Sequence, residues 1–276
     1  MTLIVTGHPR SGTQLLQRLL NGHPDVRLTN EFGCFRTLGV PRSLFALGIL
    51  GRCWARRKLP ILKPPGASPR EHLQASYAFE GRFLLQLHRM NPPLVHASHV
   101  EAILQSLLPG ARLVGDKLPD YVFNLNQFAG LDGVKTVVIY RDVRDVTASY
   151  LERLRSGWDR MPVFSAYDTP QKIAGRWVEA VRQMRKHEDE VLVLQYEALV
   201  HHPERELERL AQWLEVDAGG FPKDLVRPSG VGSYRQRLSA DERAAVEAVA
   251  GPAMAALGYA LDATVVQVQA GSTTFS

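Results

Sequence analysis

The residues most suggestive of chemistry lie in "VTGHPRSGTQLL" (5–16), near the start of the chain. Gly7 and Gly12 have the G-x-x-x-x-G spacing of a phosphate-binding loop. Thr13 and Gln14, however, stand where nucleoside triphosphatases carry the lysine and the hydroxyl residue that hold phosphates and Mg²⁺. The loop therefore predicts a site for an anion that carries less charge than a triphosphate and needs no metal.

The loop supplies its own cation, Arg10, and its neighbours in the sequence indicate how it is held. An apolar run over 2–7 predicts a buried strand, and leucines recurring on one face over 13–22 predict a helix. Backbone N–H groups at the start of such a helix point at one anion. The alternative is a glycine turn that only packs a strand on a helix, but the strand–loop–helix order favours phosphate binding.

A second candidate site lies in "VVIYRDVRDVTASYL" (137–151). Arg141 ends a predicted buried strand and can offer a fork of donors to a phosphate, while Ser149 lies about two turns along the next helix. Asp142 and Asp145 have the spacing of N-cap and first-turn residues, and Arg144 is expected to face solvent. This segment predicts a second phosphate contact.

The elements that must position these residues form an alternating pattern. Strands are predicted at 2–7, 111–117, 134–140 and 189–196, and helices at 119–129, 143–156, 197–214 and 239–257. Strands that alternate with helices predict a parallel sheet covered on both faces. Residues 33–110, with a helix near 70–90, are expected to form a helical and loop insertion that covers the sheet edge and binds the substrate. We expect one domain over 1–276, with a frayed tail at 271–276.

Composition limits the possible partners of the 276-residue chain. It is 45% apolar and 22% charged, with a net charge of +5 and a pI near 9.3, which suits an acidic ligand but indicates no nucleic-acid module. Cys34 and Cys53 are too few for a disulfide framework or a metal site. Because the chain shows neither an apolar run long enough to span a bilayer nor a signal peptide, we expect a cytoplasmic protein.

Together the two motifs resemble those of sulfotransferases that use 3′-phosphoadenosine 5′-phosphosulfate (PAPS). "GHPRSGTQLLQRLLNGHPDVRLTNE" (7–31) resembles the 5′-phosphosulfate loop of the branch with arginine in the loop, which contains protein-tyrosine and bacterial enzymes. The segment 137–151 resembles the 3′-phosphate motif, and "GDKLP" (115–119) and 194–214 resemble other recurring segments. The resemblance covers about a third of the chain and implies a P-loop-containing nucleotide-binding fold.

The resemblance implies transfer of a sulfuryl group from PAPS to a hydroxyl by in-line displacement. The product would be 3′-phosphoadenosine 5′-phosphate (PAP), and no metal is implied. Glu31 stands at the position of the family's presumed base, while Arg10 and Lys117 would stabilise charge. Arg141 and Ser149 would bind the 3′-phosphate. The residues implied to bind the 5′-phosphosulfate are Pro9, Arg10, Ser11, Gly12, Thr13 and Gln14.

Several assignments have alternatives at this stage. Glu31 could instead form a salt bridge with Arg10 or Lys117. His96 and His99 are rival bases, although their surroundings favour packing or surface roles. Tyr196 matches a family segment and is a candidate for nucleotide contact.

The loop "RPSGVGSYRQRLS" (227–239) resembles one that closes over the cofactor, so Arg235 or Ser229 could reach the 3′-phosphate. Two other functions stay open, a P-loop kinase-like phosphotransferase and a non-catalytic module that binds PAP or another nucleotide. The acceptor could be a glycan, a tyrosine peptide, a lipid or a small metabolite.

Overall fold

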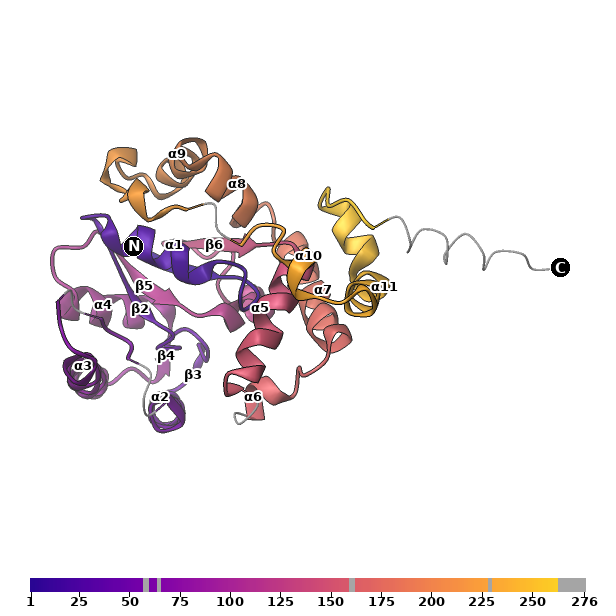
Figure 1. The fold of residues 1–276 in the computed structure, drawn as a ribbon. Helices are drawn as coiled ribbons and strands as arrows, with labels where there is room; N and C mark the ends of the chain where they lie inside the picture. Colours follow the sequence, from indigo (N-terminus) through magenta and orange to yellow (C-terminus); the bar gives the residue numbers. More distant parts are fainter. Residues whose placement is uncertain (57–59, 64–65, 159–161, 228–229, 263–276) are drawn as a thin grey trace.

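The structure, a computed structural model, describes residues 1–56, 60–63, 66–158, 162–227 and 230–262. In these residues a central sheet of parallel strands has the order β2-β5-β1-β6-β7, with helices on both faces (Figure 1). The strands are β1 (Thr2–Thr6), β2 (Val26–Asn30), β5 (Leu113–Lys117), β6 (Val134–Tyr140) and β7 (Leu192–Gln195). The predicted α/β class with a parallel sheet is confirmed.

Side chains of the central strand β1 alternate between two apolar cores. Leu3 and Val5 pack in the core that includes α1 (Thr13–Gly22), α8 (Tyr196–His201) and α9 (Pro203–Leu214). Ile4 belongs to the core on the opposite face, which is formed by the helices that follow. They are α3 (Pro69–Met90), α4 (Ala97–Leu107), α5 (Val143–Arg155), α7 (Pro170–Lys186) and α11 (Ala240–Ala256). Burial on both faces explains the continuous apolar runs of the inner strands.

The segment 33–110 contains α2 (Arg42–Arg56), α3, α4 and a small antiparallel sheet of β3 (Val40–Pro41) and β4 (Leu94–Val95). Helix α3 agrees with the helix predicted near 70–90 and begins with a capping box between Ser68 and Glu71. This segment lies beside β2 and β5 (Figure 1). Its role as a substrate-binding insertion stays a prediction.

Three parts of the chain differ from the predicted elements. Strand β2 was not predicted, because "VRLTN" is short and alternates apolar with polar residues as an edge strand does. The helix expected at 119–129 is a 3₁₀ helix, η1 (Pro119–Gln127), with a kink at Asn124. The helix expected at 197–214 breaks into α8 and α9, because Pro203 cannot continue a helix and begins a new one.

The C-terminal helix α11, which was predicted at 239–257, begins with a capping box formed by Ser239 and Glu242. Smaller elements complete the described residues, namely α6 (Pro162–Ser165), α10 (Tyr234–Arg237), η3 (Ala218–Gly220) and η4 (Lys223–Leu225). The expected frayed tail at 271–276 lies outside the described residues. None of the described helices is both long and apolar enough to cross a bilayer.

Candidate active site

The predicted site residues follow the carboxyl ends of strands that all run in one direction. Strand β1 pairs with β5 on one side and β6 on the other, and the chain crosses from one side to the other between these strands. In open parallel sheets, ligands bind at the carboxyl edge beside such a switch point. The loops after β1, β2, β5, β6 and β7 therefore share one edge of the sheet.

The phosphate loop, residues 7–12, is packed tightly between β6 and Tyr196. A Cβ placed on Gly7 would lie 2.1 Å from the Ile139 carbonyl oxygen, and one on Gly12 would lie 2.4 Å from the Tyr196 ring. Gly12 also has a left-handed φ of 101° at the N-cap of α1. Both positions therefore require glycine.

The loop presents polar groups that fit an anion. The first helical hydrogen bond of α1 is donated by the Leu16 N–H, so the N–H groups of residues 13–15 point out of the helix start. Ser11 is fully buried, and its hydroxyl has no hydrogen-bond partner within the described residues. A buried hydroxyl without a partner is unfavourable, and an anion bound at the helix start would satisfy it.

His8 lies within the phosphate loop and has a neutral side chain. The ring is buried, and Nδ1 lies 2.8 Å from the Pro9 carbonyl oxygen, to which it donates as the neutral tautomer. Burial, together with the positive Arg176, lowers the pKa of His8 to about 3. The imidazole is therefore uncharged at neutral pH and adds no charge to the site.

Arg10 and Ser149, predicted from separate motifs, meet in the structure. Arg10 has a left-handed φ of 75°, and its Nε donates to Ser149 Oγ over 2.9 Å. Burial lowers the pKa of Arg10, and the nearby positive charges of Arg153 and Arg141 lower it further. Repulsion among these arginines marks a position where a bound anion would be stabilised.

Arg141 lies beside the same loop. Its guanidinium carbon is 4.4 Å from the centroid of the Tyr196 ring, the ring that also covers Gly12. Arg141 donates to the Gly230 carbonyl and lies 3.5 Å from a carboxylate oxygen of Asp145. Its Nε has no partner among the described residues. Arg141 and Arg10 therefore border one region of the sheet edge.

Asp145 fixes the loop that follows α9 and its 3₁₀ turns. Its carboxylate accepts hydrogen bonds from the Gly232 N–H, the Ser233 hydroxyl and the Tyr234 N–H. This tertiary role goes beyond the first-turn role predicted for Asp145. In the same loop Arg235 is exposed, with its guanidinium 4.8 Å from the Tyr234 ring, whereas Ser229 lies outside the described residues.

The prediction that Arg144 faces solvent is wrong. Arg144 is only 4% exposed, forms ion pairs with Asp142 and Glu247, and stacks over Tyr234 at 4.3 Å. Asp142 does cap α5, since it accepts the Arg144 N–H at 2.8 Å. The sequence could not show this because Glu247 is 103 residues away. Arg144 thus joins α5 to α11.

Glu31 and Lys117 form the second part of the site. Lys117 is 2% exposed, and its Nζ donates to Glu31 Oε1 over 2.7 Å, while the Glu31 side chain is 35% exposed. The Glu31 N–H donates to the Lys117 carbonyl, and the residue has a left-handed φ of 57°. The salt bridge that the sequence left open as an alternative therefore forms, and the other carboxylate oxygen has no hydrogen bond or ion pair to the residues that the structure describes.

Asp116 was not identified as a site residue. It is fully buried beside Lys117, and its carboxylate accepts from Thr29 Oγ1, the Phe32 N–H, the Gly33 N–H and the Tyr121 hydroxyl at 2.7–3.0 Å. These bonds hold the turn that begins at Glu31. They also occupy both oxygens of Asp116.

The rival histidines serve the helix that they begin. His99 Nδ1 accepts the His96 N–H at 3.0 Å, so these residues form a cap at the start of α4.

Cys34 and Cys53 are thiols. Within the described residues, no cluster of three His, Cys, Asp or Glu side chains could hold a metal. Independence from metal stays a prediction.

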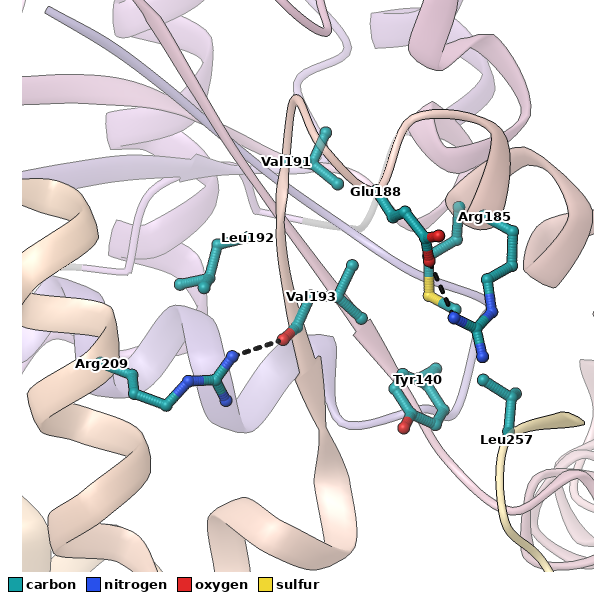
Figure 2. Close-up of a pocket in the computed structure, with 9 residues that line it drawn as sticks. Tyr140, Arg185, Glu188, Val191, Leu192, Val193, Arg209 and Leu257 are labelled. Atoms are coloured by element: carbon teal, nitrogen blue, oxygen red, sulfur yellow. Dashed lines mark hydrogen bonds and ion pairs between the residues drawn. The ribbon is translucent and has the colours of Figure 1, made fainter.

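A separate cavity of about 360 Å³ lies beside the edge strand β7 (Figure 2). Arg185 pairs with Glu188 at 2.8 Å, and Arg209 donates to the Val193 carbonyl, as the dashed lines in Figure 2 show. None of the residues that line it is a predicted site residue. Its lining includes a carboxylate, Glu188, which disfavours a bound anion.

Comparison with known proteins identifies the family. The sulfotransferase family model matches residues 3–219. A protein-tyrosine sulfotransferase of Drosophila melanogaster is 26% identical over 257 residues, 87% of this chain and 44% of that protein. Nodulation protein NoeE of Sinorhizobium fredii (strain NBRC 101917 / NGR234) is 26% identical over 236 residues, 78% of this chain and 50% of that protein. The chain thus spans about half the length of these relatives.

A solved structure shows the same fold. The sulfotransferase domain of the Synechococcus PCC 7002 olefin synthase superposes with a TM-score of 0.57 at 22% identity, covering 95% of each chain. The family match extends from β1, through the phosphate loop and the Arg141 segment, to η3. On this match, the chain belongs to the sulfotransferase family.

Proposed function

We propose that the protein transfers a sulfuryl group from PAPS to a hydroxyl acceptor. The observation that carries this proposal is the meeting of Arg10 and Ser149 beside Arg141 and the phosphate loop. Two anionic groups on one nucleotide would engage the helix start and the arginines together. PAPS supplies an activated sulfuryl group joined to a good leaving group, the 5′-phosphate.

The residues that would hold PAPS follow from the contacts in the site. The helix start and the Ser11 hydroxyl support binding of the 5′-phosphosulfate. Arg141, Ser149 and Arg10 support binding of the 3′-phosphate, and Tyr196 offers its ring beside the loop. Because Arg10 contacts Ser149, we expect its loss to weaken cofactor binding as well as turnover. Arg235 is proposed only as a rim contact, since its side chain is exposed.

Glu31 is proposed as the base. One carboxylate oxygen would accept the proton of the acceptor hydroxyl while the hydroxyl oxygen attacks sulfur, and the bond between sulfur and the 5′-phosphate oxygen breaks to release PAP. The ion pair with Lys117 would hold the Glu31 carboxylate in place while its second oxygen takes the proton. The buried ammonium of Lys117 would also stabilise negative charge on the transferring oxygens.

The Glu31→Gln variant tests the proposal. Gln keeps the size of the side chain and can still accept from Lys117, but it cannot take the proton. General-base catalysis contributes roughly 10²–10⁴-fold, so turnover of PAPS should fall at least about 100-fold while PAP affinity, measured by calorimetry, stays unchanged. Glu215→Gln is a matched control, because Glu215 also has a left-handed φ, 59°, and pairs with a lysine, Lys135, at 3.1 Å.

Each outcome decides between the candidate functions. Unchanged turnover in Glu31→Gln would remove Glu31 as the base, and loss of PAP binding as well would assign it a structural role. A chain that binds PAP but turns over no acceptor would be a binding module. Metal-dependent ATP turnover would favour the kinase-like alternative. Labelled PAPS offered with pooled glycans, phenols, lipids and tyrosine peptides would identify the acceptor, with tyrosine peptides first because a relative carries that name.

A further inference from the structure

Helix α2 carries large apolar side chains on its outer face. Leu44, Leu47, Leu50 and Trp54 are 58%, 64%, 51% and 69% exposed. At about 100° per residue, their spacing places them within an arc of about 120°. Soluble proteins rarely expose such a contiguous apolar stripe unless it meets a partner or a membrane.

The opposite face of α2 is fixed in the core. Phe45 and Ile49 are fully buried, and Phe45 stacks on Phe83 of α3 with ring centroids 6.5 Å apart. The side chain of Arg52 packs against Gly33, where an added Cβ would lie 3.0 Å from it. The helix lies at the margin of the molecule, at the bottom of the view in Figure 1. Its outer stripe is therefore held rigidly at the surface and is no part of the core.

The charge of this segment indicates what the stripe meets. Residues 32–70 contain eight Lys and Arg and no Asp or Glu. The chain has 33 basic and 28 acidic residues, so the remainder carries 25 basic against 28 acidic ones. The whole positive net charge of the protein therefore lies in the segment that carries the exposed stripe. An exposed apolar stripe within a positively charged segment complements a surface with anionic groups outside and an apolar layer underneath.

We propose that α2 docks the protein on an anionic lipid bilayer. Leu44, Leu47 and Leu50 would enter the boundary between headgroups and acyl chains, and Trp54 would lie at headgroup level, where indole rings are enriched. Basic residues of the same segment would be attracted to the anionic headgroups near the surface. The helix lies on the membrane and does not span it. Since Arg52 packs against the turn that begins at Glu31, docking would bring that turn near the lipid surface.

Vesicle flotation with the full chain tests this proposal. We expect binding to vesicles containing about one third phosphatidylglycerol in phosphatidylcholine, little binding to phosphatidylcholine alone, and weaker binding as salt is raised. Leu47→Glu should lower the partition coefficient at least about tenfold, because it replaces a leucine that would enter the lipid with a charge. Leu131→Glu is the matched control, since Leu131 is an exposed leucine, 44%, far from α2 in sequence.

Trp54 provides an independent signal. Its emission, taken as the difference between the parent chain and Trp54→Phe, should shift to the blue when anionic vesicles are added. Leu44→Glu repeats the test if Leu47→Glu lowers the melting temperature. Failure to bind anionic vesicles, or equal weakening by Leu131→Glu, would overturn the proposal. A concentration-dependent dimer that Leu47→Glu dissolves would also overturn it, by assigning the stripe to a second copy of the chain. These readouts do not depend on sulfuryl transfer.

Discussion

The variant Asp116→Asn tests whether Asp116 positions the proposed base, Glu31, without contributing to cofactor binding. Asp116 uses one oxygen for Thr29 Oγ1 and the Phe32 N–H, and the other for the Gly33 N–H and the Tyr121 hydroxyl. In the Asn side chain an NH₂ group replaces one of these oxygens. This group cannot accept the two hydrogen bonds that the oxygen accepted. Since a hydrogen bond to a charged group contributes about 1.5–3 kcal/mol, we expect the free energy of unfolding to fall by about 2–4 kcal/mol.

The catalytic effect follows from the same turn. Loss of the Gly33 bond frees the backbone two residues after Glu31, and a displacement of about 1 Å in a reacting group can lower a rate about 100-fold. We therefore expect kcat to fall by roughly this factor, with PAP affinity unchanged. Steady-state kinetics with calorimetry would separate these quantities, and urea unfolding would give the stability.

Asp145→Asn is the matched control for this experiment. Asp145 is equally buried, but its bonds hold the 232–234 loop beside Arg141 instead of the Glu31 turn. Asp145→Asn should weaken PAP binding more than it lowers kcat at saturating PAPS. If Asp116→Asn kept the parent kcat and stability, or if both variants lost PAP affinity equally, the assignment of Asp116 to the Glu31 turn would be refuted.

Three other predictions address the cofactor loop and its support. Arg141→Ala should weaken PAP binding about 10–100-fold but leave binding of adenosine 5′-phosphate nearly unchanged; an unaltered cofactor KM would contradict its role. Gly12→Ala should lower both PAP affinity and melting temperature, because its Cβ would meet Tyr196, whereas Gly39→Ala, with φ 74° and no neighbour within 4 Å, shows the effect of φ alone. In the folded chain the pKa of His8 is depressed to about 3. Below pH about 6.5, the unfolded chain therefore binds a proton at His8 that the folded chain does not. The free energy of unfolding consequently decreases as the pH falls below this value. Between pH 7 and 5, urea unfolding of His8→Asn should lose about 2 kcal/mol less stability than the parent, and equal losses would contradict the burial of a neutral His8.

The sheet and the approximate site could be predicted because their signals are local. Each inner strand reads as an apolar run followed by a helical pattern, and the phosphate loop is defined by residues that are adjacent in the sequence. Arg141 and Ser149 are likewise separated by one strand end and two helical turns. Strand β2 was missed because its edge position leaves Arg27 exposed among the apolar residues.

Contacts distant in the sequence could not be predicted in the same way. Asp116 bonds to backbone N–H groups more than 80 residues earlier, and a backbone donor leaves no trace in the sequence. The burial of Arg144 depends on Glu247 of α11, and the position of the 232–234 loop depends on Asp145 of α5. Residue types therefore identified candidates for chemistry, whereas the carboxylates that position them emerged only from the fold.

The arginine group explains why one ligand should engage both motifs. Arg10, Arg141, Arg153 and Arg237 are close enough that the last three lower the pKa of Arg10, and Glu152 opposes them only in part. Such repulsion destabilises the unliganded site, and a phosphate between Arg10 and Arg141 would relieve it while accepting from Ser149. Tyr196 contacts both Gly12 and Arg141, so a displacement of either residue on anion binding would move the same ring. Binding of the nucleotide's two ends is therefore expected to be cooperative, so that PAP should bind more tightly than its two phosphate contacts would predict separately.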